Sequence, residues 1–400
     1  MPHDVSLIST IAVGLALAFA GGFAAVRLGL PPIVGYLLAG VAAGPFTPGF
    51  VADTHLAPQL AEIGVMLLMF GVGMHFSIRD LVAVHRIALP GAVAQITAAT
   101  LLGIGTTRIW GWSLGAGLTL GLALSVASTV VLLRTLEERG LVGLADGRIA
   151  VGWLIVEDLL TVIALVALPA LAPALGGSAA TDPGGLGLSL TLTFAKIAGF
   201  VAIMLILGIR LLPWLLDQVV RTRSRELFTL AVIAAALGIA FGAAELFGSA
   251  PLGAFLAGIV VSESDHSHRA AEQAKPFEDA FAVLFFLSVG MLFDPGILLR
   301  HPVEVLVVLA IVMLGKSLAA FAIVRIAGYA TVTALTVSAG LAQIGEFSFI
   351  LADLGTGYGL LSAEGRNLIL AAALLSITLN PLAFRGAAAM RRRLEAGHLF

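Results

Sequence analysis

The sequence predicts an all-α protein that crosses a membrane about thirteen times. Of its 400 residues, 59% are hydrophobic and only 12% are charged, whereas about 25% of the residues in a soluble domain are charged. The hydrophobic residues come in unbroken runs of about 20, the length of a transmembrane helix. They do not alternate in short segments as in a transmembrane β-barrel. We expect one transmembrane domain over residues 1–385, followed by a short cytoplasmic tail over 386–400.

The expected helices are the apolar runs between loops that carry charge, proline or glycine. Their ranges are 5–26, 31–46, 57–76, 87–107, 112–134, 147–172, 190–213, 226–246, 250–262, 274–293, 303–324, 330–354 and 363–385. The first run has no basic start and no small-residue cleavage site, and it is long for a signal peptide, so we interpret it as a true span. The net charge of −2 gives no sign of nucleic-acid binding, and the lack of cysteine excludes disulfides and thiol catalysis.

Basic residues predict the orientation, because Lys and Arg near helix ends are retained in the cytoplasm. With thirteen spans, most of the basic residues fall in loops on the side of the C-terminus. Only Arg108, Arg300 and Arg366 fall on the opposite side, and Lys196 and Lys316 lie inside helices. We therefore expect the C-terminus in the cytoplasm and the N-terminus outside.

Three short motifs recur in the same order in the second half of the chain. Leu-Ala-Gly at 38–40 recurs at 256–258, Val-Gly-Met-x-Phe at 72–76 recurs at 289–293, and Gly-Leu-Ala at 121–123 recurs at 340–342. The copies are separated by 218, 217 and 219 residues. This separation corresponds to a shift of seven helices, an odd number, so the two copies must cross the membrane in opposite directions. We predict two inverted six-helix repeats, over 5–172 and 226–385, joined by a linker helix over 190–213. Such repeats are typical of secondary transporters, whose site lies where the repeats meet.

Three charges lie in the middle of predicted spans, where each costs roughly 2.5–3.5 kcal/mol on insertion scales. They are Glu157, Asp158 and Lys316. Adjacent side chains on a helix point about 100° apart, so one carboxylate can bind an ion while the other meets a partner. A carboxylate whose proton competes with a monovalent cation gives coupled exchange by itself. Lys316 can lose its proton where an arginine could not. The alternative is a buried ion pair that only fixes helix packing.

Two predicted helices carry polar or glycine-rich stretches at matched positions in the repeats. The helix over 112–134 contains Ser125, Ser128 and Thr129, and the helix over 330–354 contains Gln343 and Glu346. Discontinuous helices of this kind use their freed backbone groups on an ion. Hydroxyls bonded back to their own helix are the alternative for the serines and the threonine.

Several separate motifs together resemble the monovalent cation:proton antiporter-2 family, and within it the Kef-type potassium:proton antiporters and their YbaL-like branch. The motifs are Val-Gly-Trp-Leu-Ile-Val-Glu-Asp-Leu at 151–159, Leu-Ala-Gln-Ile-Gly-Glu-Phe-Ser-Phe-Ile at 341–350, Phe-Phe-Leu-Ser-Val-Gly-Met at 285–291 and Leu-Pro-Pro-Ile-Val-Gly-Tyr-Leu-Leu-Ala-Gly-Val at 30–41. The resemblance covers essentially the whole chain. It implies a sodium/proton-antiporter-like fold in which two discontinuous helices cross beside the ion site.

The resemblance also implies residue roles. Asp158 would carry the ion and the proton, and Glu157 would face Lys316 as its charge partner. We expect the ion and proton site to be formed by Asp158, Glu157, Ser125, Ser128 and Thr129. Gln343 and Glu346 would support the site. Sodium-type relatives usually carry Asp-Asp at the acidic pair and Kef proteins often Gln-Asp, whereas this chain has Glu-Asp. Relatives usually continue into a cytoplasmic nucleotide-binding regulatory domain; we expect no such domain and no cofactor in these 400 residues.

We therefore expect a homodimeric antiporter of the bacterial inner membrane that exchanges K⁺, in preference to Na⁺, for H⁺ by an elevator motion. A gated or ligand-controlled cation efflux channel on the same scaffold is the alternative. We do not expect an enzyme, because the sequence lacks His-Glu-x-x-His and Gly-x-Gly-Asp motifs.

Overall fold

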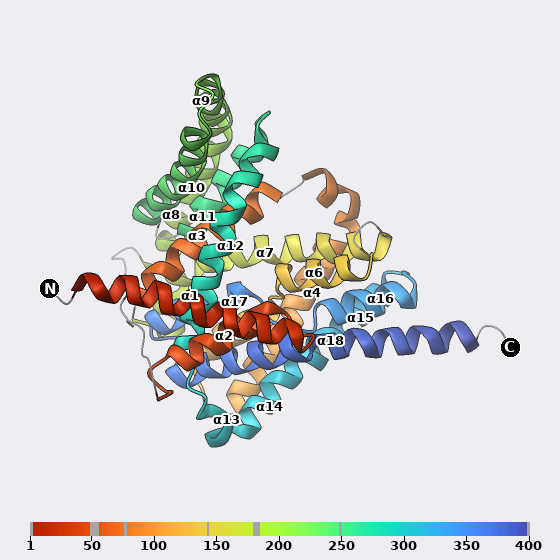
Figure 1. Cartoon of the computed structure of the whole chain (residues 1–400). Coiled ribbons are helices and arrows are strands. Elements are labelled where there is room, and N and C mark those ends of the chain that lie inside the picture. The colour runs from red at the N-terminus through yellow and green to blue at the C-terminus, as the bar shows by residue number, and fades with distance from the viewer. Residues whose placement is uncertain are drawn as a thin grey trace. The chain divides into compact units, whose positions relative to one another are not determined.

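The computed structural model describes residues 3–48, 56–75, 78–141, 144–178, 185–247 and 250–397, and all the regular structure in these ranges is helical (Figure 1). The predicted all-α class is confirmed. Seven of the described helical segments are long and apolar enough to cross a membrane. They are Leu7–Arg27, Val84–Ile109, Ala145–Leu175, Ala198–Arg221, Arg225–Leu246, Pro302–Ile326 and Ala363–Arg393. A helix or a pair of helices also lies in each of the thirteen predicted ranges, but a count of thirteen crossings stays a prediction.

The chain divides into two compact units. The first unit comprises Met1–Ala24, Gly35–Phe76 and Thr181–Leu292, and the second comprises Ala25–Val34, Ser77–Ala180 and Phe293–Phe400. Each unit is therefore built from segments of both halves of the sequence.

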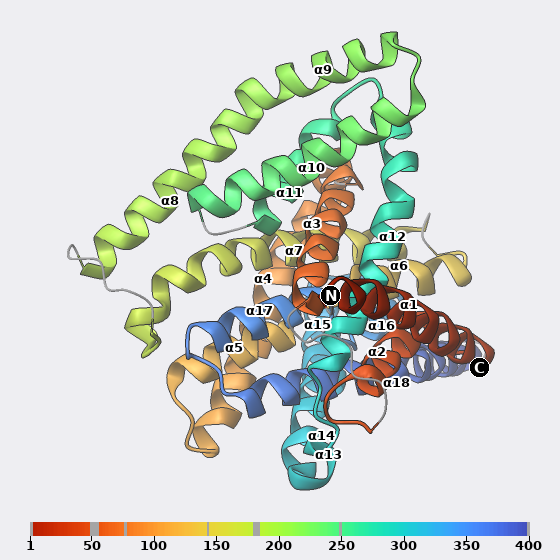
Figure 2. The same ribbon diagram turned by 60° about the vertical axis from the view of Figure 1, so that its left-hand side comes forward.

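In the first unit, α3 packs against α11 and α12, and α10 packs against α11 (Figure 2). Its helices are α1 (His3–Arg27, with its last residues in the second unit), α2 (Pro32–Ala43), α3 (Leu56–His75), α8 (Gly185–Ile203), α9 (Ile209–Arg221), α10 (Arg225–Phe247), α11 (Ala250–Ser262) and α12 (Ser267–Met291). A π-helical stretch, Met204–Gly208, joins α8 to α9. Helical structure therefore continues past the predicted end at 213, with Pro213 inside α9.

Two glycine pairs bring helices of the first unit into backbone contact. A Cβ atom added at Gly40 of α2 would lie 2.1 Å from the carbonyl oxygen of Leu287 and 2.8 Å from the Cα atom of Gly290, both on α12. One added at Gly73 of α3 would lie 3.1 Å from the Cα atom of Gly258 on α11. Only glycine permits such close packing of two helices. All four glycines belong to the repeated motifs; the last residue of the 72–76 motif lies outside the described residues.

The second unit is arranged around α4 and α7. A Cβ atom at Gly91 of α4 would lie 2.4 Å from the ring of Trp153 on α7, so the fully buried indole lies directly on the α4 backbone. The helices of this unit are α4 (Ile78–Ile109), α5 (Leu114–Ser125), α6 (Thr129–Glu138), α7 (Ala145–Leu171), α13 (Ile297–Arg300), α14 (Pro302–Ala310), α15 (Ser317–Ile326), α16 (Thr331–Gly340), α17 (Glu346–Gly357) and α18 (Ala363–Gly397). A π-helical stretch, Ile311–Lys316, joins α14 to α15.

Two long predicted helices are interrupted where their polar stretches lie. The first yields α5 and α6, and the second yields α16 and α17. In contrast, α18 runs on to Gly397, beyond the predicted helix end at 385. Most of the expected tail is thus helical, because its Ala, Arg, Leu and Glu residues are strong helix formers; residues 398–400 lie outside the described part.

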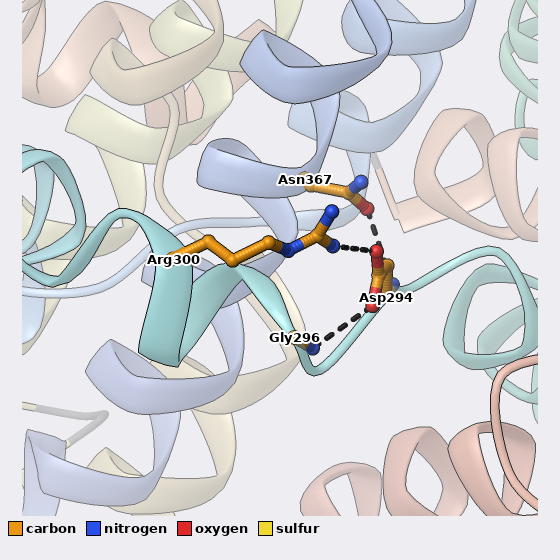
Figure 3. Close-up of polar contacts among 4 residues, drawn as sticks. All are labelled: Asp294, Gly296, Arg300 and Asn367. Atoms are coloured by element: carbon orange, nitrogen blue, oxygen red, sulfur yellow. Dashed lines mark hydrogen bonds and ion pairs between the residues drawn. The ribbon is translucent and has the colours of Figure 1, made fainter.

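A polar cluster links the short α13 to the start of α18 within the second unit (Figure 3). The Asp294 carboxylate accepts a hydrogen bond from the Gly296 amide at 2.9 Å and forms an ion pair with Arg300. The backbone amide of Asp294 donates to the Oδ1 atom of Asn367 on α18 at 3.3 Å. This cluster holds the turn that leads into α14, and Arg300 is one of the few basic residues expected on the outer side.

Candidate functional site

The two interrupted helices of the second unit meet at their breaks. The Gly345 amide donates a hydrogen bond to the carbonyl oxygen of Val126 at 3.1 Å. The Gln343 side chain forms a reciprocal pair with the backbone of Ser128: its Oε1 atom accepts from the Ser128 amide at 3.0 Å, and its Nε2 atom donates to the Ser128 carbonyl at 3.0 Å. Buried backbone N–H and C=O groups need hydrogen-bond partners. Here residues of each break provide these partners for the backbone of the other.

The three predicted hydroxyls of the first break have different partners. Ser125 donates back to the carbonyl of Leu122 in its own helix at 2.7 Å. Ser128 donates to Oε2 of Glu346 at 3.1 Å and also caps the start of α6. Thr129 donates to Oδ2 of Asp158 at 2.8 Å. The back-bonded alternative therefore describes Ser125, whereas Ser128 and Thr129 contact carboxylates.

The adjacent carboxylates of α7 reach different parts of the break. Glu157 is fully buried, and its Oε2 atom accepts a hydrogen bond from the Ala127 amide at 3.1 Å. Asp158 is 3% exposed and accepts from Thr129. The second oxygen of each carboxylate, Oε1 of Glu157 and Oδ1 of Asp158, has no hydrogen-bond partner among the described residues. The site thus offers free carboxylate oxygens beside an uncoiled backbone, the ligand type that a hard cation prefers.

Lys316 lies between the two breaks. It is fully buried at the end of the π-helical stretch, a distortion often found at functional sites. Its Nζ atom donates to the carbonyl oxygens of Ser125 at 3.2 Å and Gln343 at 2.9 Å, one from each break. Within the described part of the chain, no carboxylate oxygen lies within 4.0 Å of this ammonium group. Its predicted pairing with Glu157 stays a prediction.

Three further polar residues at the crossing were missed by sequence reasoning. On α18, Ser376 accepts from the Ile344 amide at 3.3 Å and Asn380 donates to the Ala339 carbonyl at 2.9 Å. On α4, Gln95 donates to the Ser125 carbonyl at 3.0 Å. Each is an uncharged polar residue in a largely apolar run, and Ser376 and Asn380 share one such run, Ser-Ile-Thr-Leu-Asn at 376–380. That is the only signal that could have found them.

Replacing Lys316 by Gln should lower the melting temperature of the purified protein. The change removes an ammonium that bonds two buried carbonyls, and each such charge-assisted bond contributes about 1.5–3 kcal/mol. The lower desolvation cost of a neutral side chain offsets part of this loss, so we expect a net loss of about 1–3 kcal/mol. Lys196→Gln is the matched control, because Lys196 is exposed on α8. Equal melting curves for the two variants would contradict the contacts of Lys316.

Crossed broken helices beside buried carboxylates define a class of protein, the ion-coupled secondary transporters with discontinuous helices. The chain belongs to the sodium/hydrogen exchanger family, whose transmembrane family model matches residues 14–387. It is thus a multi-pass membrane protein of a cation/proton antiporter family.

Individual proteins support this assignment. YbaL of Escherichia coli (strain K12), whose name describes a cation/proton antiporter, is 59% identical over 387 residues, which cover 96% of this chain and 69% of YbaL. K(+) efflux antiporter 4 of Arabidopsis thaliana is 34% identical over 384 residues, 96% of this chain and 64% of that protein. The predicted resemblance to the Kef-type and YbaL-like antiporters is confirmed.

A solved structure supports the fold. The sodium proton antiporter MjNhaP1 of Methanocaldococcus jannaschii superposes with a TM-score of 0.72 at 16% identity, over 95% of this chain and 97% of MjNhaP1. The antiporter-like fold predicted from the sequence is therefore confirmed at the level of the overall architecture.

Proposed function

We propose that this protein exchanges a monovalent cation, with K⁺ preferred over Na⁺, for protons, and that Asp158 binds each in turn. The observation that carries the proposal is the position of Asp158: it is buried beside the crossing of the two breaks, with Oδ2 held by Thr129 and Oδ1 without a partner in the described chain. The preference for K⁺ is supported by the plant relatives named as K(+) efflux antiporters.

The other site residues have distinct proposed roles. Oxygen atoms of Ser125, Ser128 and Thr129 complete the cation site with Asp158. Glu157 and Lys316 balance the charge of the site as it loads and unloads, and Gln343 and Glu346 hold the first break. Protonation of Asp158 releases the cation, and cation binding expels the proton. Competition of the two for one carboxylate couples their movements.

The transport motion that we propose is elevator-type alternating access. All of the proposed site residues lie in the second unit, so a movement of this unit as one body would carry the intact site. We assign dimerisation to the first unit and expect a homodimer in the bacterial inner membrane. Thirteen spans would place the N-terminus outside and the C-terminus in the cytoplasm, as the basic residues favour.

Reciprocal glycine contacts support the proposed inverted repeats over 5–172 and 226–385. In the repeated motifs, Gly40 corresponds to Gly258 and Gly73 to Gly290. The structure packs Gly40 against Gly290 and Gly73 against Gly258. Two repeats related by a twofold axis make each contact twice in this exchanged manner.

The test is ion-coupled flux in liposomes that contain the purified protein. With the membrane potential clamped at zero and equal K⁺ concentrations on both sides, an imposed pH gradient should drive K⁺ uptake. Replacement of K⁺ by Na⁺, Rb⁺ or Li⁺ should show the order of preference among the cations. A gated or ligand-controlled channel on the same scaffold would conduct K⁺ but would not respond to the pH gradient at zero potential. K⁺ movement that is independent of the pH gradient would therefore favour the channel and reject the antiporter.

A further inference from the structure

Gln95 is a buried amide within a stripe of small residues on α4. Ala92 and Ala99, three residues before it and four after it, are fully buried on the same helix face, and so is Gln95. An amide at such a position is costly unless its atoms are bonded. Its Nε2 atom donates to the Ser125 carbonyl at 3.0 Å, but its Oε1 atom has no partner among the described residues. The reverse orientation would set two oxygens against each other, so the donor must face Ser125.

Ser125 is the last residue of α5, where carbonyl groups have no partner within the helix. Its carbonyl accepts from two side chains at once, Gln95 at 3.0 Å and Lys316 at 3.2 Å. A carbonyl has two lone pairs, so both of its acceptor positions are in use. Gln95 and Lys316 thus share one acceptor at the edge of the proposed ion site.

The two donors also lie near corresponding places in the two repeats. The repeat separation of about 218 residues relates Ser125 to Gln343, and it brings Gln95 within one helical turn of Lys316. Gln95 donates to the Ser125 carbonyl, and Lys316 donates to the Gln343 carbonyl. Each break therefore has a donor from the preceding helix of its own repeat, neutral in the first and charged in the second.

We propose that Gln95 is a positioning residue of the ion site: it holds the Ser125 carbonyl so that Lys316 can leave it during the transport cycle. This inference rests on the proposed antiport function. When the site exchanges a cation for a proton, its charges are rearranged, and the nearby ammonium is drawn to a different position. Without Gln95, each departure of Lys316 would leave a buried carbonyl with no donor, at a substantial cost. With Gln95, the carbonyl stays bonded and the backbone of the break keeps its place.

The first test measures transport by Gln95→Met, which keeps the length of the side chain and removes its N–H donor. We expect the maximal rate of K⁺/H⁺ exchange in liposomes to fall about tenfold, with the apparent KM for K⁺ changed less than about twofold. Thr100→Val is the matched control, because Thr100 is also buried on α4 and its hydroxyl has no partner in the described chain. The proposal would be overturned if Gln95→Met exchanged ions as fast as the control, or if only its apparent KM for K⁺ changed.

The second test needs no transport activity and uses melting temperatures of Gln95→Met, Lys316→Met and the double variant, because methionine removes the donor at each position. Because either donor alone still satisfies the shared carbonyl, the double variant should lose more stability than the sum of the single losses. Thr100→Val combined with Lys316→Met should be additive. Additivity in both pairs would overturn the shared-acceptor arrangement. Absence of coupled exchange in the unaltered protein would reject the proposed function instead, while the melting temperatures would still decide the place of Gln95.

Discussion

Replacing Asp158 by Asn should abolish cation-driven proton movement and leave the protein folded. Asn has the same shape and can still accept the hydrogen bond from Thr129, but it cannot bind and release a proton or supply a negative charge to a cation. We expect proton flux in liposomes to fall to the level of protein-free vesicles at every pH and K⁺ concentration. The melting temperature should stay the same or rise, because a buried charge has been removed.

Asp353→Asn is the control for this experiment. Asp353 lies on α17 in the same unit, but its side chain is 49% exposed and pairs with Arg366 at 3.5 Å, away from the breaks. Exposed ion pairs contribute little, so this variant should retain exchange. Cation-dependent proton flux that persists in Asp158→Asn would show that another group carries the proton, and the proposed mechanism would then be wrong.

Replacing Gly345 by Ala should strongly destabilise the crossing and eliminate transport. A Cβ atom at this position would lie 2.7 Å from the carbonyl oxygen and 2.8 Å from the carbonyl carbon of Ala127, and 2.9 Å from the Cα atom of Ser128. These are backbone atoms, which cannot rotate away as a side chain could. The φ angle of Gly345 is −102°, which any residue can adopt, so the effect would come from the contact alone. Overpacking of this kind costs about 1–3 kcal/mol, and we expect a lower melting temperature.

Gly357→Ala tests the same substitution at the other end of α17 without the contact. Gly357 ends α17, and a Cβ atom there would meet nothing within 4 Å. Alanine is favoured over glycine in helices by about 1 kcal/mol, so this variant should be unchanged or slightly more stable. If Gly345→Ala matched Gly357→Ala in melting temperature and transport, the two breaks could not approach each other as closely as the structure shows.

Much of the site could be predicted because its charged and polar residues can be recognised from their immediate sequence neighbours. Glu157, Asp158 and Lys316 stand out as charges in apolar runs, and the breaks near Ser128 and Gln343 stand out as polar interruptions of helices. These signals depend only on the cost of placing polar groups in a membrane, which holds whatever the helix contacts are. For the same reason, the sequence predicted where each helix lies better than where it ends. The helices α9 and α18 continue beyond their predicted ends.

The sequence by itself determined that this protein is an all-helical membrane protein of the antiporter type with acidic residues in its interior. Only the tertiary structure decided which residues form hydrogen bonds with one another. Gln343 pairs with Ser128, 215 residues away, and Gln95 and Lys316 meet at one carbonyl although they lie far apart in the chain. Hydropathy records how much each residue avoids water, but a hydrogen bond depends on which helices pack together and in what register. That choice is made collectively by close contacts such as the one at Gly345, and no single segment of the sequence contains it.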